Sequence, residues 1–210
     1  WRDWSSDVCS SDLIATRDIC LIHGPPGTGK TTTVVELIAQ LAKRGQHVLA
    51  CAPSNVAVDN MIEKLAKTGF NIVRIGHPAR VLPNVVRFCL EDLYLESNAY
   101  EVVMSMRQSM AEMEKSLRKI RSWAEKKSIF NELRVMRKEI KKREITGMKN
   151  ILKEADIVLA TCTGAADRLL ADIGFDYAVV DEACHGLEPI VMIPLLKANR
   201  GLLAGDHNQL

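Results

Sequence analysis

Several features that would place this chain in a special class of protein are missing from its sequence. Its six cysteines form no CxxC pair and follow no regular spacing, so they indicate neither a zinc site nor a disulfide framework. The longest apolar runs, such as IVMIPLL at 190–196, are too short to span a bilayer. We find no secretory pattern of basic start, apolar stretch and small-residue cleavage site. The net charge of +2 does not by itself indicate a nucleic-acid binder.

The chain does have enough apolar residues for one buried core. Of its 210 residues, 47% are hydrophobic, which suits one globular domain. The cysteines are isolated and mostly lie in apolar segments, as is typical of proteins in a reducing compartment. We therefore expect an intracellular protein, located in the cytoplasm, the nucleus or both.

The amino-terminal residues do not read like part of this domain. The segment DWSSDVCSSDL at 3–13 is rich in serine and aspartate and has no usable periodicity. A common sequencing adapter, translated in one frame, yields the same residues. We therefore expect 1–13 to be an adapter-derived artefact without function, the alternative being a natural disordered tail.

A phosphate-binding loop is predicted at 24–31. The letters GPPGTGKT fit the pattern of Gly24, four residues, Gly29, Lys30 and Thr31. The loop follows a strand-like apolar run at 18–23 and precedes apolar residues at helical spacing over 33–43. Strand, glycine-rich loop and helix is the context that makes this motif specific. The backbone N–H groups and the positive end of the helix would face phosphate oxygens.

Each residue type in this loop has a role in binding Mg-ATP. Lys30 would neutralise charge on the β- and γ-phosphates, and the Thr31 hydroxyl would hold Mg²⁺. The residues expected to contact the nucleotide are Gly24, Pro25, Pro26, Gly27, Thr28, Gly29, Lys30, Thr31 and Thr32.

Apolar segments along the chain predict a parallel sheet in an α/β fold. We expect strands at 47–54, 71–76, 155–162, 177–183 and 200–206, a helix at 56–69, and helical stretches between the last three strands. Strands that are apolar throughout, rather than alternating, indicate a sheet covered on both faces.

A pair of acidic residues follows one of these strands. Asp181 and Glu182 stand at the end of AVVDE, where a parallel sheet places its ligands. Asp181 would hold Mg²⁺, partly through water, and Glu182 would orient and deprotonate the attacking water.

The segment 88–150 has a different pattern, which predicts an inserted helical hairpin. One apolar stripe comprises Val103, Met106, Met110, Met113, Leu117 and Ile120, and a second, after a break near 122–128, comprises Phe130, Leu133, Met136 and Ile140. The outer faces are rich in lysine and arginine. They could lie near a nucleic-acid backbone, or they could be a solvated surface that keeps the hairpin soluble.

Six motifs in order resemble those of superfamily 1 helicases. They read GPPGTGKTTTVVE, CAPSNVAVDN, RIGHPARV, VLATCTGA, VVDEAC and LAGDHNQL. The resemblance is to the group of the nonsense-mediated decay helicase, and within it to the immunoglobulin mu-binding protein 2 type. It covers nearly all of 17–210.

The resemblance implies an architecture and a reaction. The segments 14–87 and 151–210 would form the first RecA-like ATPase domain, and 88–150 its insertion. Such helicases use ATP and Mg²⁺ to move on single-stranded DNA or RNA, in the 5′ to 3′ direction, and we expect a monomer. The chain would be a fragment that lacks the second motor domain and the arginine which that domain supplies.

The resemblance also implies residue roles beyond the ATP loop. Gln209 would contact the γ-phosphate and couple it to the nucleic acid. The residues expected on the backbone of a bound strand are Pro53, Ser54 and Asn55 in one motif, and Thr161, Thr163 and Gly164 in another. The chain departs from the family at His185, where glutamine is usual, and at Asn208, where lysine is usual.

Two other classes of protein share some of these features. GPPGTGKT also suits ATPases that remodel proteins, although their acidic strand follows the loop more closely than the roughly 150 residues found here. A nucleic-acid-binding module with an inert ATP site is the second alternative. Intact Lys30, Asp181 and Glu182 argue against it.

Overall fold

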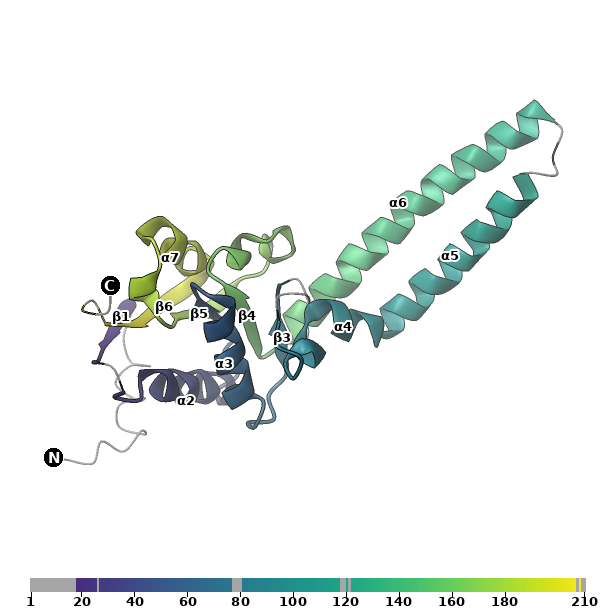
Figure 1. Ribbon diagram of the computed structural model, residues 1–210. Coiled ribbons are helices and arrows are strands. Elements are labelled where there is room, and N and C mark those ends of the chain that lie inside the picture. The colour runs from purple at the N-terminus through teal and green to yellow at the C-terminus, as the bar shows by residue number, and fades with distance from the viewer. Residues whose placement is uncertain are drawn as a thin grey trace.

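Six parallel strands make the sheet in the part of the chain that the structure describes. The structure is a computed structural model, and it describes residues 18–25, 27–76, 81–117, 120, 122–206 and 208. The strands are β1 (Ile19–His23), β2 (Val48–Ala52), β3 (Ile72–Arg74), β4 (Ile157–Thr161), β5 (Phe175–Val180) and β6 (Ala198–Gly205). Their order is β1-β6-β5-β2-β4-β3, and every pair is parallel (Figure 1). The predicted α/β fold is confirmed.

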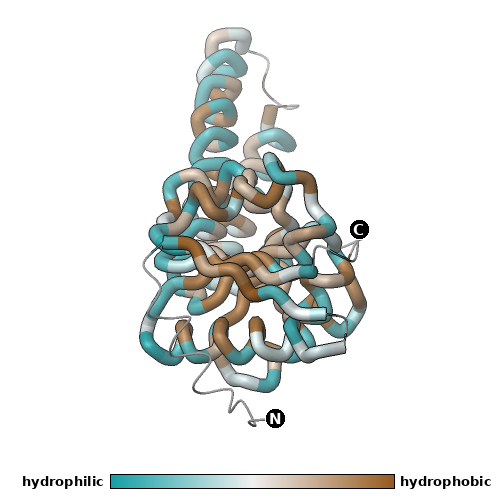
Figure 2. Tube along the Cα trace, turned by 90° about the vertical axis from the view of Figure 1, so that its left-hand side faces the viewer, coloured by the Kyte–Doolittle hydropathy of each residue, from teal (hydrophilic) through white to brown (hydrophobic). Residues whose placement is uncertain are grey.

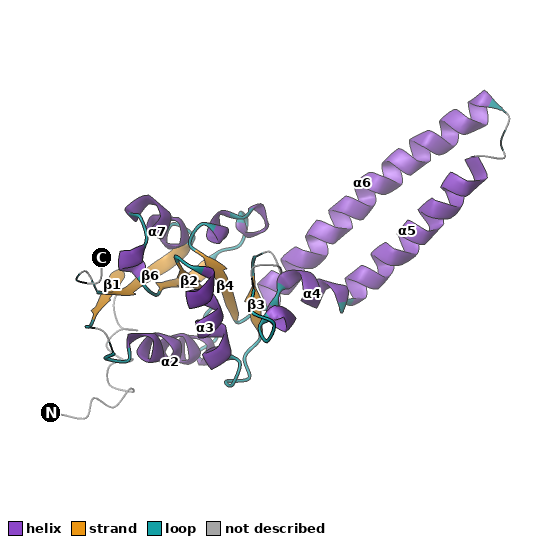
Figure 3. Ribbon diagram, viewed as in Figure 1, coloured by secondary structure: helices purple, strands orange, loops and turns teal. Residues whose placement is uncertain are grey.

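Helices cover both faces of this sheet (Figure 3). The helices are α2 (Lys30–Lys43), α3 (Asn55–Leu65), α4 (Leu90–Leu95), α5 (Asn98–Leu117), α6 (Trp123–Glu154) and α7 (Glu188–Leu195). The described ranges also contain short 3-10 turns, namely η2 (Val86–Phe88), η3 (Gly164–Ala166), η4 (Arg168–Leu170) and η5 (Ala183–His185). Helices α2 and α3 lie on one face, and α7 lies on the other.

Strand β2 shows why the apolar runs predict a doubly covered sheet. All five of its residues are buried. Val48 and Ala50 pack in the core beneath α2 and α3, whereas Leu49 and Cys51 pack in the core on the opposite face. Because successive side chains of a strand point to opposite faces, both sets must be apolar. Figure 2 shows the resulting concentration of hydrophobic residues in the sheet.

The inserted hairpin projects from the β3 edge of the sheet (Figure 1). Its antiparallel helices α5 and α6 contain 20 and 32 residues. At a rise of about 1.5 Å per residue they are about 30 and 48 Å long. Gly147 of α6 lies against α4, and a Cβ there would stand 2.8 Å from Cε2 of Tyr94. No described helix is both long and apolar enough to cross a membrane.

Three sequence expectations about helices are wrong in detail. Helix α6 begins at Trp123, with Ser122 as its N-cap, so most of the expected break at 122–128 is helical. Phe130 is 59% exposed, and Ile129 is the more buried residue of the two. Ile129 and Phe130 lie four and three residues before Leu133, so helical periodicity fits both of them. The spacing alone therefore does not determine which of the two side chains is buried. Between β4 and β5 the expected helical stretch consists of η3 and η4 alone.

A buried ion pair ties α3 to β3. Arg74 and Asp59 are 1% and 2% exposed, and Arg74 Nε donates to Asp59 Oδ1 at 2.7 Å. Asp59 Oδ2 accepts the N–H of Leu82 at 3.0 Å, and Arg74 Nη2 donates to Asn55 Oδ1 at 3.1 Å. Each buried charge is therefore satisfied by further hydrogen bonds, which such pairs require.

Replacing Asp59 with alanine should strongly destabilise the domain. It leaves the Arg74 guanidinium buried without its counter-ion, and breaking such a pair costs about 3–5 kcal/mol. The free energy of unfolding, measured by urea titration with circular dichroism, should fall by that amount. Arg143→Ala is the control, because it breaks an exposed pair with Glu139 and should cost about 1 kcal/mol or less. Equal losses in the two variants would contradict this account.

Candidate nucleotide and nucleic-acid sites

The predicted phosphate loop connects β1 to α2 and has the backbone that phosphate binding requires. Gly27 and Gly29 have φ of 76° and 84°, in the left-handed region that glycine adopts without strain. Gly29 is the N-cap of α2, so the loop leads directly to the positive end of this helix. The Gly24 N–H donates to the carbonyl of Gly205 at 3.4 Å, which anchors the loop on β6.

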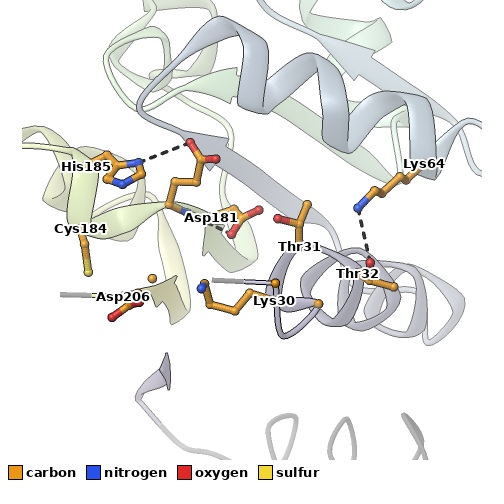
Figure 4. A pocket seen from close by; sticks show the side chains of 12 residues that line it. Lys30, Thr31, Thr32, Lys64, Asp181, Cys184, His185 and Asp206 are labelled. Atoms are coloured by element: carbon orange, nitrogen blue, oxygen red, sulfur yellow. Dashed lines mark hydrogen bonds and ion pairs between the residues drawn. The ribbon is translucent and has the colours of Figure 1, made fainter. Parts of the chain in front are cut away.

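The ammonium group of Lys30 folds back over this loop. Its Nζ donates to the carbonyl of Gly24 and, at 3.0 Å, to that of Pro25. The Thr28 hydroxyl donates to the same Pro25 carbonyl at 2.8 Å. Lys30 is thus positioned by loop carbonyls that phosphate oxygens can replace, and Figure 4 shows it reaching into the cleft.

The acidic pair forms the opposite wall of the cleft. Asp181 follows β5, is 3% exposed, and its N–H donates to Cys51 O at 2.9 Å. Its Oδ1 accepts the N–H of Glu182 at 3.0 Å. Glu182 has φ of 54°, which is uncommon for a residue other than glycine and is often found at functional sites. Its Oε2 lies 3.8 Å from Nδ1 of His185.

Together these walls enclose a cleft of about 420 Å³ (Figure 4). It is lined by Gly27, Gly29, Lys30, Thr31, Thr32, Lys64, Asp181, Glu182, Cys184, His185, Gly205 and Asp206. The predicted loop and the predicted acidic pair, about 150 residues apart in the chain, therefore meet at one site.

The sequence analysis missed two charged residues that line the cleft. Asp206 follows β6, is 4% exposed, and its Oδ1 lies 3.3 Å from Nε2 of His23. The rule that singled out Asp181, an acid at the end of an apolar strand, would also have found it. Lys64 reaches the cleft from α3, where its Nζ donates to Thr32 Oγ1 at 3.4 Å. No local motif marks Lys64.

The donor groups in the cleft fit Mg²⁺. Thr31 and Asp181 face the same space from α2 and from the end of β5 (Figure 4). A hydroxyl and a carboxylate are the oxygen ligands that Mg²⁺ takes alongside water and substrate phosphates. We therefore expect these two residues to hold the ion, which would neutralise charge on the phosphates.

The candidate strand-contacting residues also come together, at the ends of two neighbouring strands. Ala52 of β2 pairs with Thr161 of β4, so the residues after each strand are adjacent. Ser54 caps α3 by accepting the Ala57 N–H at 3.1 Å. Thr161 Oγ1 accepts the Gly164 N–H at 3.0 Å. These turns carry structural hydrogen bonds as well as exposed polar groups.

A buried thiol lies between the two threonines of this surface. Cys162 is fully buried, and burial raises the pKa of its thiol to about 11. The thiol therefore stays protonated near neutral pH and contributes packing only. Two site residues expected from the sequence, Pro26 and Gln209, lie outside the described residues.

The strand order and this cleft define a P-loop nucleotide-binding domain with a polar surface at the same sheet edge. A family model described as "AAA domain" matches residues 4–210. The chain therefore belongs to this family.

Curated relatives resemble nearly the whole chain. It is 44% identical over 212 residues to "DNA-binding protein SMUBP-2" of Rattus norvegicus, covering 99% of this chain and 22% of that protein. It is 40% identical to "DNA polymerase alpha-associated DNA helicase A" of Schizosaccharomyces pombe, covering 94% and 30%. It is 35% identical to "ATP-dependent helicase upf1" of the same yeast, covering 94% and 21%. The predicted resemblance to superfamily 1 helicases is confirmed, and the chain spans about a fifth to a third of these relatives.

Replacing Lys30 with alanine should weaken nucleotide binding by this chain. Hydrogen bonds to charged groups contribute about 1.5–3 kcal/mol, so the dissociation constant of Mg-ATP should rise about 10- to 100-fold in calorimetry. Lys64→Ala removes a second cation from the same cleft, but one held on α3 beside Thr32, and should have the smaller effect. A larger effect at Lys64 would contradict the assignment of Lys30.

Proposed function

We propose that this chain acts as the first motor domain of an ATP-dependent nucleic-acid helicase that moves 5′ to 3′ on a single strand. One observation supports this function above the others. The ATP cleft and the candidate strand surface share one sheet edge and lie close together. A Cβ on Gly186, directly after η5, would lie 3.3 Å from Cγ of Pro53.

The residues of this chain divide the work of ATP hydrolysis. Lys30 and the loop N–H groups would bind the β- and γ-phosphates, and Asp181 and Thr31 would hold Mg²⁺. Glu182 is 41% exposed at the mouth of the cleft, where it can accept a proton from the attacking water. Gln209 would contact the γ-phosphate and couple its presence to the strand-binding surface.

The strand surface is neutral, which suits contacts to the backbone without reading bases. Ser54, Thr161 and Thr163 offer hydroxyl groups, and the Gly164 backbone is close by. The Oδ1 of Asn55 already accepts from Arg74, so the Asn55 amide N–H groups are oriented by a buried guanidinium and can donate to a phosphate.

The strand is proposed to be DNA. Relatives with 40–44% identity are named for DNA binding or as a DNA helicase. These names, with that of the yeast ATP-dependent helicase, favour a helicase over a protein-remodelling ATPase. Lys30, Asp181 and Glu182 all line the cleft, which favours an active over an inert ATP site. We further propose an intracellular monomer.

Replacing Asn55 with aspartate should weaken single-strand binding about equally for all base sequences. The variant keeps the shape and the Arg74 contact, but it places a negative charge against the phosphates. Fluorescence anisotropy with labelled dT, dA and mixed oligonucleotides measures the effect. Asn60→Asp is the matched control, since Asn60 is exposed on the same helix. A loss confined to one base sequence, or equal losses in both variants, would refute the backbone contact.

The 210-residue chain alone should bind Mg-ATP without hydrolysing it at the rate of a motor. Lys30 and Lys64 are the cations among the described residues that line the cleft, and no described arginine lines it. An arginine that stabilises the transferring phosphoryl group accelerates such reactions about 10³- to 10⁵-fold. Calorimetry should therefore detect binding, while a phosphate-release assay with saturating single strand detects almost no turnover. Rapid, strand-stimulated turnover would show that these residues suffice for catalysis.

A further inference from the structure

One side of α6 carries basic and hydrophobic side chains but no carboxylate. We call it the α6 outer face, and it consists of Trp123, Lys127, Phe130, Arg134, Lys138, Lys141 and Ile145. These residues recur at spacings of three and four, so they lie along one side of the helix. All seven are exposed. The carboxylates of Glu125, Glu132, Glu139 and Glu154 fall on other sides of the helix, and that of Glu144, which borders this face, is paired with Arg107.

The cations of this face are separate from the ion pairs of the hairpin. Among the described residues, those pairs are Arg107–Glu144, Arg137–Glu114, Arg143–Glu139 and Lys149–Asp172. None of them includes Lys127, Arg134, Lys138 or Lys141. A solvated helix surface usually interleaves charges of both signs, whereas this face concentrates positive charge and would attract a polyanion.

The face also exposes two large aromatic rings. Trp123 is 74% exposed and Phe130 is 59% exposed. The Nζ of Lys127 lies 5.2 Å from the centroid of the Trp123 ring, so cation and ring already share one site. Isolated exposed hydrophobic residues are common. Here, however, two rings alternate with cations that lie outside the ion pairs of the hairpin. This combination binds unpaired bases together with their phosphates.

We propose that the α6 outer face binds single-stranded DNA, with Trp123 and Phe130 stacking on bases and the four cations contacting phosphates. The occupant is single-stranded because duplex bases are already stacked on one another. Lys127, Arg134 and Lys141 are each two helical turns apart, about 10.5 Å, which lets one strand run along the hairpin. This inference rests on the proposed function, because the strand is the one that the motor domain holds.

The first test removes charge from this face. In the full chain, the triple variant Arg134→Gln, Lys138→Gln, Lys141→Gln is compared with Lys43→Gln, Arg44→Gln, Lys67→Gln, which removes three exposed cations elsewhere. Each phosphate contact contributes about 0.7 to the slope of log K against log salt for a single strand. The first variant should make this negative slope less steep by about 2 for oligo-dT. The control should leave the slope near the wild-type value. Equal slopes would overturn the proposal.

The second test observes stacking directly. In a background of Trp1→Phe and Trp4→Phe, Trp123 is the one tryptophan left. Its fluorescence should be quenched on oligo-dT binding, and Phe130→Leu should weaken binding several-fold. Unchanged emission in the bound state would overturn the stacking role.

The two proposals fail in different ways. If the wild-type chain binds no oligonucleotide, the proposed function fails and this inference fails with it. If the wild type binds and Asn55→Asp weakens binding, while the hairpin variant matches its control, only the present inference is overturned.

Discussion

The parallel pairing of β5 between β6 and β2 is the constraint on which the site depends. In this register Val180 lies beside Cys51 on one side and Leu203 on the other. The three strands therefore end at one edge, and their next residues face the same space. Asp181 and Asp206 reach the cleft for this reason, and the turn at Ser54 follows β2 at the same edge. A shift of one residue in this register would exchange the two cores and dismantle the cleft.

How much the sequence predicts depends on whether the signal is local. The phosphate loop, α2 and the acidic pair could be located because each is specified within about a dozen residues. Lys64 could not, because it reaches the cleft only when α3 packs beside α2. Phe130 was misplaced because three- and four-residue spacings from Leu133 both satisfy helical periodicity. The connection from β4 to β5 was expected to be helical, yet η3 and η4 suffice to cross one face of the sheet.

The buried pair of Arg74 and Asp59 connects stability to the strand surface. The Arg74 guanidinium donates hydrogen bonds to both Asp59 and Asn55. The same group therefore neutralises a buried carboxylate beneath α3 and orients the amide that is proposed to bind phosphate. A Cβ on Gly76 would collide with Nη1 of Arg74, so a larger residue there would require the guanidinium to shift. Preorganised polar groups lose little freedom when a ligand binds. The Asn55 amide is thus already oriented by the fold in the absence of a nucleic-acid strand.

The turn η5 has tight contacts at both ends, and it lies between the ATP cleft and the candidate strand surface. A Cβ on Gly205 would stand 2.7 Å from Sγ of Cys184, while a Cβ on Gly186 would stand 2.8 Å from Cγ2 of Val191. The two glycines therefore let η5 sit in close contact between the end of β6, which anchors the phosphate loop, and Pro53, which begins the strand surface. Protein interiors are close-packed and resist compression. The turn therefore connects Glu182, which is its N-cap and lines the cleft, to the start of the candidate strand surface through a short run of close contacts.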